Sequence, residues 1–406
     1  MKKTKLALAI TASAFIASPA LATNGTNMVG LGAQSAALGG TGTAAYYGAE
    51  NVIINPGLIG KAQGTEFSFG GTVFMPSVKN DASGQGEEKS KANLNLIPSV
   101  SLASRINDQL TFGIGMYGTS GMGVDYSDAA TMMEAQSNMQ IMRFAPSIAF
   151  NQSNFGVGFS PIIQYGSLDI NYDMNGMTGP DGNTHNQVGS GMASDLGMGF
   201  SIGGYFDVNS QLTVAASYTS AINMKYDGQL SSASAPFVGA QGLESAFGDE
   251  LEQPAELKLG AAYSMGNMIY TADFKQLAWG QAKGYKDFGW EDQNVFALGA
   301  KYSANNYWAG VGINSGNNPI KEQSATARGG AVTNMFNNLF FPATTESHIT
   351  FGGGYNLTKH VSLDAAIVYA PEVKTKVKVP DMAGGITDNA TTHSQMGYTF
   401  SARYNF

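Results

Sequence analysis

Four histidines are the side chains of this sequence best suited to bind a metal ion or to act as a general base, and they are His185, His348, His360 and His393. They do not show the short spacings that are typical of zinc ligands. The sequence contains no cysteine, which excludes thiolate metal sites, cysteine nucleophiles and disulfides. Asp169, Asn171 and Asp173 resemble the start of a calcium loop, but Met174 stands where the turn glycine is needed. We therefore expect no metal site and no cofactor.

One glycine-rich motif has the form that binds dinucleotides in other proteins. Residues 40–45, GTGTAA, match G-x-G-x-x-A, but no strand pattern precedes them and no alternating helices follow. No G-x-S-x-G nucleophile elbow occurs. His348 or His393 can pair with a serine on a neighbouring strand, since catalytic triads are spatial, but polar residues lining an interior explain them more simply. We expect that the protein is not an enzyme.

The element that positions His393 is a strand with one apolar and one polar face, residues 393–406. The period of two is that of a β-strand. A row of large aromatics on a last strand favours a membrane barrel, with lipid outside and a polar lumen inside, and the stretch resembles the C-terminal assembly signal of bacterial outer-membrane barrels. The apolar parity contains Tyr398, Phe400, Ala402, Tyr404 and Phe406.

Short polar turns alternate with long loops along the whole chain. Six turns and seven loops predict fourteen strands, an even number with the short turns on one side. We therefore predict an all-β fold, a 14-stranded antiparallel transmembrane β-barrel. The strands are expected at 66–78, 93–104, 109–117, 139–150, 155–175, 192–206, 211–226, 254–264, 268–278, 293–303, 307–314, 345–356, 360–371 and 393–406.

The side-chain parity predicts which residues face lipid and which face the lumen. Leu257 and Leu259 are expected outside, and Glu256 and Lys258 inside. The alternative is a soluble β-sandwich or β-helix. Aromatic residues gather beside the short turns, where an interfacial girdle would lie, and these are Phe150, Phe155, Phe206, Tyr302, Tyr307, Tyr355 and Phe406.

The N-terminus and the composition indicate export to an outer membrane. Residues 1–22 have the lysine-rich start, apolar centre and small-residue cleavage site of a signal peptide, which predicts a mature start at Thr23. No later segment is apolar enough for a transmembrane helix. The net charge is −8 over 406 residues, with 13% charged, so there is no basic surface for nucleic acid. The expected location is the outer membrane of a Gram-negative bacterium.

A segment before the first strand, residues 23–62, is rich in glycine and alanine and shows no sustained period. It reads as a compact hatch that plugs the lumen of a barrel formed by residues 63–406. Its run GLGAQS, then LGGTG, then ENV and NPGL follow the order of the N-terminal hatch of the FadL/TodX family, which this chain resembles. The expected hatch residues are Asn24, Asn51, Asn55, Pro56 and Gly57, and Gly57 replaces the alanine that is usual in the family.

The resemblance implies a fourteen-stranded outer-membrane transporter for long-chain fatty acids or related hydrophobic compounds. Transport would be passive, with capture by loops, binding in the lumen and lateral release through a kink in the third strand. Gly113 and Gly115 are the expected lateral gate, because interior glycine marks bends in strands. The N-terminal end of the hatch, residues 23–28, would cap the lumenal pocket.

Apolar loop residues and inward cations are the candidate substrate-binding residues. Flexible methionines and phenylalanines suit recognition of hydrocarbon chains, although they can equally pack the loops together. A fatty acid carboxylate would need a cationic partner, whereas an aromatic hydrocarbon would not. The candidates are Phe237, Val238, Leu243, Phe247, Met132, Met133, Arg143, Lys258 and Arg403.

The expected partners are a hydrophobic small molecule or fatty acid and the lipid of the outer membrane, with no nucleic acid, and the protein is expected to be a monomer. The alternative function is that of an outer-membrane structural or binding protein, such as an adhesin or phage receptor, whose loops bind a partner.

Overall fold

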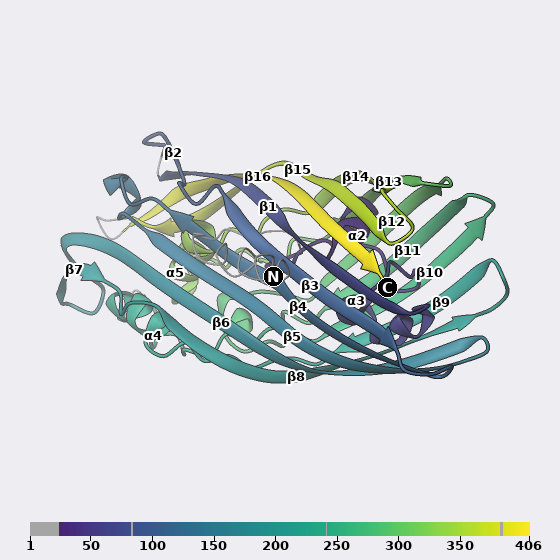
Figure 1. Cartoon of the computed structure of the whole chain (residues 1–406). Coiled ribbons are helices and arrows are strands. Elements are labelled where there is room, and N and C mark those ends of the chain that lie inside the picture. Colours follow the sequence, from purple (N-terminus) through teal and green to yellow (C-terminus); the bar gives the residue numbers. More distant parts are fainter. Residues whose placement is uncertain (1–23, 83, 241, 382–384) are drawn as a thin grey trace, which may run out of the picture.

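The computed structural model describes residues 24–406 except 83, 241 and 382–384, so the expected signal peptide, residues 1–22, and Thr23 lie outside the described residues. Within the described part, sixteen strands form one antiparallel sheet; β2 and β7 each pair with a single neighbour, which leaves fourteen strands in the wall. The wall closes where the last strand pairs with the first, from Glu66 with Asn405 to Ala82 with Asn389. Figure 1 shows this seam, with yellow β16 beside purple-blue β1.

The wall strands alternate between short turns at one end and long loops at the other. They are β1 (Thr65–Ala82), β3 (Asn95–Arg105), β4 (Leu110–Asp125), β5 (Gln136–Gln152), β6 (Phe155–Thr178), β8 (Ala193–Asp207), β9 (Leu212–Thr219), β10 (Glu256–Met265), β11 (Met268–Leu277), β12 (Gln293–Ser303), β13 (Tyr307–Gly316), β14 (Ser347–Asn356), β15 (Val361–Pro380) and β16 (Ile386–Asn405), with β2 (Glu87–Lys89) and β7 (Thr184–Val188) in the loops.

The predicted fourteen-stranded barrel is confirmed, and the boundaries of several strands differ from the prediction. The strand expected at 211–226 ends at Thr219, beyond which Ile222 and Lys225 make only isolated bridges to another part of the same loop. The loops expected at 118–138 and 372–392 are shorter, because β4, β5, β15 and β16 continue into them. These extensions are rich in glycine or lysine and therefore resemble loops in composition.

The alternation of side chains follows the prediction. Leu257 and Leu259 are 38% and 47% exposed on the outer face, whereas Glu256 and Lys258 are buried inside. Aromatic residues of the expected girdle meet at the turns: the ring centroids of Phe150 and Phe155 are 6.5 Å apart. Such a belt of aromatics marks the membrane interface next to the short turns.

Helices are short and lie in the hatch or the loops. No helix of the described residues is long and apolar enough to cross a membrane. The hatch contains α2 (Ala33–Ala37), α3 (Asn51–Ile54) and the 3₁₀ turn η1 (Pro56–Lys61). The long loops contain η2 (Ala130–Met132), α4 (Gln229–Ser234), η3 (Ala235–Phe237), η4 (Tyr285–Phe288), α5 (Gly330–Met335) and the π-helical turn η5 (Phe336–Phe340).

The hatch occupies the lumen at the short-turn half of the barrel. Helix α2 packs against β14 and β15, and η1 packs against β5, β6 and β8 on another part of the wall. The purple segments in Figure 1 lie within the barrel, behind the strands of the near wall. Almost every hatch residue is buried, including Leu38 and Leu58. The hatch therefore plugs the barrel from wall to wall.

Candidate functional site

The hatch is fixed to the wall by hydrogen bonds between its backbone and inward polar side chains. The backbone N–H groups of Gly42 and Thr43 donate to one oxygen of Asp273, at 3.0 and 2.9 Å. The backbone N–H of Gly39 donates to Thr350 Oγ1 at 2.9 Å. Because buried backbone groups require partners, these wall residues replace the water that would otherwise solvate the hatch.

The asparagines of the expected hatch motif hold the segment in shape. Asn55 Nδ2 donates to the carbonyl of Thr43 at 2.7 Å, and its Oδ1 accepts from the N–H of Gly57 at 3.0 Å. Asn51 Oδ1 accepts from the N–H of Tyr47 at 2.6 Å. Pro56 follows in the first turn of η1, where its fixed φ and missing N–H are tolerated.

Gly57 packs more tightly than the sequence suggests. A Cβ atom at this position would lie 2.7 Å from the carbonyl oxygen of Gly203 in β8. The alanine that is usual in the family therefore does not fit here unless the backbone shifts. Gly158 lies on β6, the strand next to β8, and also approaches the hatch closely. Its Cβ position would be 2.4 Å from the carbonyl carbon of Pro56.

The N-terminal end of the hatch pairs with β4 at the point where that strand leaves β3. Pairing between β3 and β4 runs only from Arg105–Thr111 to Ser99–Tyr117. Beyond it, the N–H of Met28 donates to the carbonyl of Thr119 at 3.1 Å, and the N–H of Gly121 donates to the carbonyl of Thr26 at 3.1 Å. The hatch thus satisfies backbone groups that β3 leaves unpaired.

The separation of β3 from β4 begins at Gly118, not at the glycines expected from the sequence. A register irregularity between Gly118 and Ser120 marks the bend. Gly113 and Gly115 lie in the regularly paired part of the strand, and the Cβ position of Gly113 is only 2.6 Å from Val52 Cγ2 of the hatch. These two glycines make room for the hatch, so the expectation that they mark the bend is wrong.

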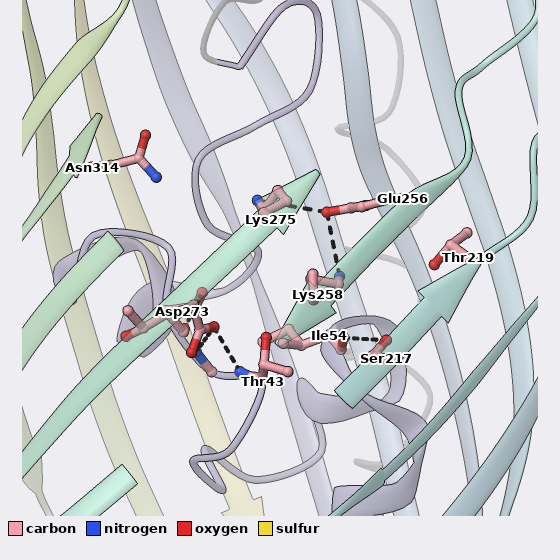
Figure 2. A network of polar contacts seen from close by, with 12 residues as sticks. Thr43, Ile54, Ser217, Thr219, Glu256, Lys258, Asp273, Lys275 and Asn314 are labelled. Carbon is pink, nitrogen blue, oxygen red and sulfur yellow. Dashed lines mark hydrogen bonds and ion pairs between the residues drawn. The ribbon is translucent and has the colours of Figure 1, made fainter. Parts of the chain in front are cut away.

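A cluster of charged side chains lines the lumen above the hatch. Lys258 Nζ lies 3.6 Å from Glu256 Oε1, and Lys275 Nζ lies 3.7 Å from the same oxygen. Figure 2 shows the two lysines on β10 and β11 converging on Glu256, with Asp273 and Thr43 on the hatch side. Arg143, on β5, four strands from β10 around the wall, is also buried and donates from Nε to Gln164 Oε1 at 2.9 Å.

This cluster holds more positive than negative charge. Arg143, Lys258 and Lys275 line one small cavity together with Glu256, and Asp273 interacts electrostatically with both lysines. Three cations against these two carboxylates leave an excess of one positive charge, and Asp273 also accepts two hatch N–H groups. Buried charge without a partner is costly, so the arrangement suits an anionic group placed among these three cations.

The space beside the cluster is small in this state. A cavity of ≈ 40 Å³ is lined by the three cations, Thr119, Thr219 and the hatch residues 27–31. It has about the size needed for a single water. A larger hollow of ≈ 760 Å³ lies among residues of β10–β14, including the lipid-facing Leu298 and Val311, and none of the residues that line it is charged.

Arg143 and Lys258 face inward, as expected from the sequence, whereas the third cation, Lys275, is not among the expected residues. Lys275 shares the inward parity of Asp273 and stands opposite Lys258 in the β10–β11 hairpin, a register that the Gly266-containing turn could have supplied. Arg403, the other expected cation, lies outside the cluster. Its Nε is 2.6 Å from Asp364 Oδ2, so the guanidinium is already paired.

The buried carboxyl group of Glu50 in the hatch lies near the Arg403–Asp364 pair. Glu50 Oε1 accepts from Ser68 Oγ at 3.1 Å and Ser401 Oγ at 2.9 Å. Burial raises the pKa of Glu50 to about 7, against the opposing effect of Arg403. The site thus joins the hatch to both strands of the closing seam, β1 and β16.

The apolar loop candidates are brought together but are not exposed. Phe247 contacts Phe336 with ring centroids 5.5 Å apart, and Phe237 contacts the same ring at 5.9 Å. Val238 and Phe247 are partly buried and pack against this core, whereas Phe237, Leu243, Met132 and Met133 are buried within it. In this state the loop residues form a closed apolar layer over the lumen, which differs from the exposed capture patch expected from the sequence.

The histidines do not assemble a metal site. His348 and His393 are buried on the inner wall, and His393 Nδ1 lies 2.8 Å from the carbonyl oxygen of Pro342. No group of three or more metal-binding side chains occurs among the described residues. Asp169 and Asp173 lie on the long strand β6, as the sequence indicated.

Comparison with known proteins identifies the architecture. The crystal structure of a Pseudomonas aeruginosa FadL homologue superimposes with a TM-score of 0.70 at 17% identity, covering 96% of this chain and 100% of that one. The structure of the P. putida toluene transporter TodX gives 0.67 at 18% identity, covering 93% and 99%. At these identities the likeness establishes the fold.

Sequence comparison shows the family to which the chain belongs. A long-chain fatty acid transport protein of Escherichia coli O6:H1 is 24% identical over 313 residues, which cover 64% of this chain and 69% of that protein. The family model described as outer membrane protein transport protein (OMPP1/FadL/TodX) matches residues 8–406. The chain therefore belongs to the OMPP1/FadL/TodX family and is a transport protein of the Gram-negative outer membrane, not an enzyme.

Proposed function

We propose that this protein carries long-chain fatty acids, or closely related hydrophobic anions, across the outer membrane by passive diffusion. The excess of buried positive charge formed by Arg143, Lys258 and Lys275 is the observation that supports this cargo. A carboxylate placed there would form charge-assisted hydrogen bonds. An aromatic hydrocarbon would leave the three cations without an additional partner.

Binding of such a molecule requires the hatch to move. The cavity of ≈ 40 Å³ is far smaller than the ≈ 300–1,000 Å³ of typical ligand pockets. Hatch residues 27–31 form one side of it. They are held to β4 by the N–H of Met28, which donates to the carbonyl of Thr119, and through the preceding Thr26, whose carbonyl accepts from the N–H of Gly121 and from Ser120 Oγ. Their displacement would enlarge the pocket and free the edge of β4 in one step.

The same displacement supplies a lateral exit between β3 and β4. Ile97 of β3 covers Gly118, whose Cβ position lies 2.4 Å from Ile97 Cγ2. Ile97 also packs with Phe74 and Met28, so withdrawal of Met28 would loosen this apolar contact. A hydrophobic molecule can then leave into the bilayer without crossing water, which its apolar surface disfavours. A single chain closes the barrel, which supports transport by a monomer.

Binding of labelled oleate to the detergent-solubilised protein tests the proposed cargo. The double variant Lys258→Gln, Lys275→Gln should bind oleate at least about tenfold more weakly, because charge-assisted hydrogen bonds are lost. Lys283→Gln, on an exposed loop, is the control and should bind oleate as the wild type does. Heat-modifiable migration on a gel would verify that both variants are folded.

Binding of toluene separates this cargo from the aromatic alternative. The double variant should bind toluene as well as, or better than, the wild type does. Unchanged oleate affinity in the folded double variant would contradict the assignment of the carboxylate site. Uptake of labelled oleate by cells that carry the protein would then decide whether fatty acids are transported at all.

A further inference from the structure

The outer face of β15 changes from apolar to basic at the bulge between Ala370 and Val373. Below it, Leu363 and Tyr369 face lipid and are 47% and 40% exposed. Above it, every second residue is a lysine whose side chain is at least half exposed, and these are Lys374, Lys376 and Lys378. The strand therefore presents a basic stripe directly above its membrane-facing part.

The strand register extends this stripe across the closing seam. Lys374 stands opposite Thr392 of β16, and Thr392 stands opposite Lys79 of β1. Lys79 in turn stands opposite Lys89 of β2. Directly opposed residues share one face of a sheet, so these lysines form one row on the outside of four neighbouring strands. Figure 1 shows β15, β16, β1 and β2 side by side at the long-loop end. We call Lys79, Lys89, Lys374, Lys376 and Lys378 the lysine face.

The lysine face carries an excess of positive charge. Three carboxylates share this outer surface, and they are Asp81, Glu87 and Asp388. Glu87 lies 3.4 Å from Lys79 and 3.9 Å from Lys374, so it serves both, and Asp388 likewise serves Lys376 and Lys378 at 2.8 and 2.6 Å. Five lysines against three carboxylates leave two positive charges in the outward row, although the whole chain has a net charge of −8. Two further carboxylates border the row at the edge of β15: Glu372 in the bulge, and Glu322, whose Oε1 accepts from the backbone N–H of Lys378 at 3.2 Å.

The height of the lysine face matches a lipid headgroup layer. Tyr404 contacts Phe406 of the aromatic girdle, with ring centroids 4.7 Å apart, and is twelve residues from Thr392 along β16. At about 3.3 Å per residue and a tilt of about 40°, this separation corresponds to about 30 Å along the membrane normal. The apolar band of such barrels is about 25 Å tall. The lysines therefore lie just beyond the far edge of the hydrocarbon layer.

We propose that the lysine face binds the phosphate groups of an outer-leaflet lipid, beside the seam where the barrel closes. The apolar residues below it, such as Tyr369 and Met396, stand opposite each other on β15 and β16 and contact the acyl chains of the same molecule. Lysine is a mobile point charge that suits phosphate. The occupant is a membrane lipid because the apolar residues that contact hydrocarbon and the lysines above them form one continuous surface.

Native mass spectrometry of the whole protein with bisphosphorylated lipid A tests this proposal. The variant Lys374→Gln, Lys376→Gln, Lys378→Gln should bind lipid A roughly tenfold more weakly, since each lysine near anionic lipid contributes appreciably. The matched control removes three exposed loop lysines that also have acidic partners, Lys225, Lys283 and Lys321. It changes the net charge equally and should alter binding by less than about twofold.

Two further measurements make the result decisive. Monophosphorylated lipid A should bind the wild type more weakly than the bisphosphorylated form, and inorganic phosphate should not displace either lipid. Equal loss in both triple variants would indicate a general effect of charge and would overturn the proposal, as would unchanged binding by the lysine-face variant. Displacement by inorganic phosphate would overturn the assignment to a lipid. Heat-modifiable migration on a gel would show that both variants retain the barrel.

Discussion

Single residues determine how closely the hatch approaches the wall. Which residues they contact in the folded protein is the feature of the site that is hardest to predict from sequence. Parity along a strand was sufficient to place Lys258 inside the barrel. It did not reveal that Arg403 is paired with Asp364, because these residues are 39 positions apart and meet only through the register of β15 with β16. Close approach of backbone to backbone, as at Gly57, leaves no pattern in the sequence.

Replacement of Gly57 by alanine should loosen the hatch. The new Cβ would lie 2.7 Å from the carbonyl oxygen of Gly203, and relief of the overlap should cost about 1–3 kcal/mol of docking free energy. Hydrogen exchange of hatch amides should therefore become faster. Gly64→Ala is the matched control, since its Cβ would be at an ordinary 3.6 Å from the nearest atom. Equal protection in the two variants would contradict the packing argument.

Docking of the hatch should depend on pH through Glu50. Burial raises the pKa of this carboxyl from 4.5 to about 7, so the docked state favours the protonated form. Docking should be strongest below pH 4.5 and should weaken as the pH rises to about 7, by an amount on the order of 3 kcal/mol. Hatch hydrogen exchange, corrected for intrinsic rates, measures the effect. Glu50→Gln should remove the pH dependence, and a persistent slope in this variant would assign it to another group.

At the scale of elements, the strands were predicted well inside the membrane, where apolar and polar side chains must alternate. The prediction failed where strands continue beyond the lipid, as β15 does. The run KTKVKVP at 374–380 alternates perfectly, but its outward residues are lysines, and so its composition is that of a loop. Strand β4 shows the opposite difficulty. Its many glycines hide the point at which it leaves β3, and only the pairing pattern shows that this point is Gly118.

A disulfide across the β3–β4 separation should block lateral release. The Cβ position of Gly118 lies 3.7 Å from Ile97 Cβ, close to the mean of about 3.8 Å in natural disulfides. The chain has no cysteine of its own, so Ile97→Cys, Gly118→Cys forms a single bridge. The oxidised variant should lose uptake of labelled oleate, and a reductant should restore it. Full uptake by the oxidised protein would rule out this exit.

At the scale of the whole molecule, the number of strands followed from the alternation of short turns and long loops. A membrane barrel allows no free edge, because unpaired backbone groups cannot be solvated in lipid. That constraint makes an even count of strands readable from sequence. The hatch has no such constraint. Its existence followed from composition and family resemblance, whereas its attachment to Asp273, Thr350 and Asn314 required the structure.

The seal of the lumen against ions should depend on Asp273. Asp273→Ala would leave the N–H groups of Gly42 and Thr43 without their acceptor, at a cost of about 1–3 kcal/mol for each. Single-channel recordings in planar bilayers should then show more frequent or larger openings than those of the wild type. Asp273→Asn retains an acceptor oxygen and should stay close to the wild type. Identical recordings for all three proteins would show that the seal lies elsewhere.

The seam between β1 and β16 also bears on the order of assembly. It joins Glu66 to Asn405, the two ends of the wall sequence, and contacts so distant along the chain form late. Gly39 and Gly312 approach so closely that the Cβ position of Gly312 lies 2.2 Å from the Gly39 nitrogen. We therefore expect the hatch to be in place before the two ends meet, because so close a fit leaves no room to insert it into a closed barrel. Closure of the seam between β1 and β16 would then depend on the hatch already filling the lumen.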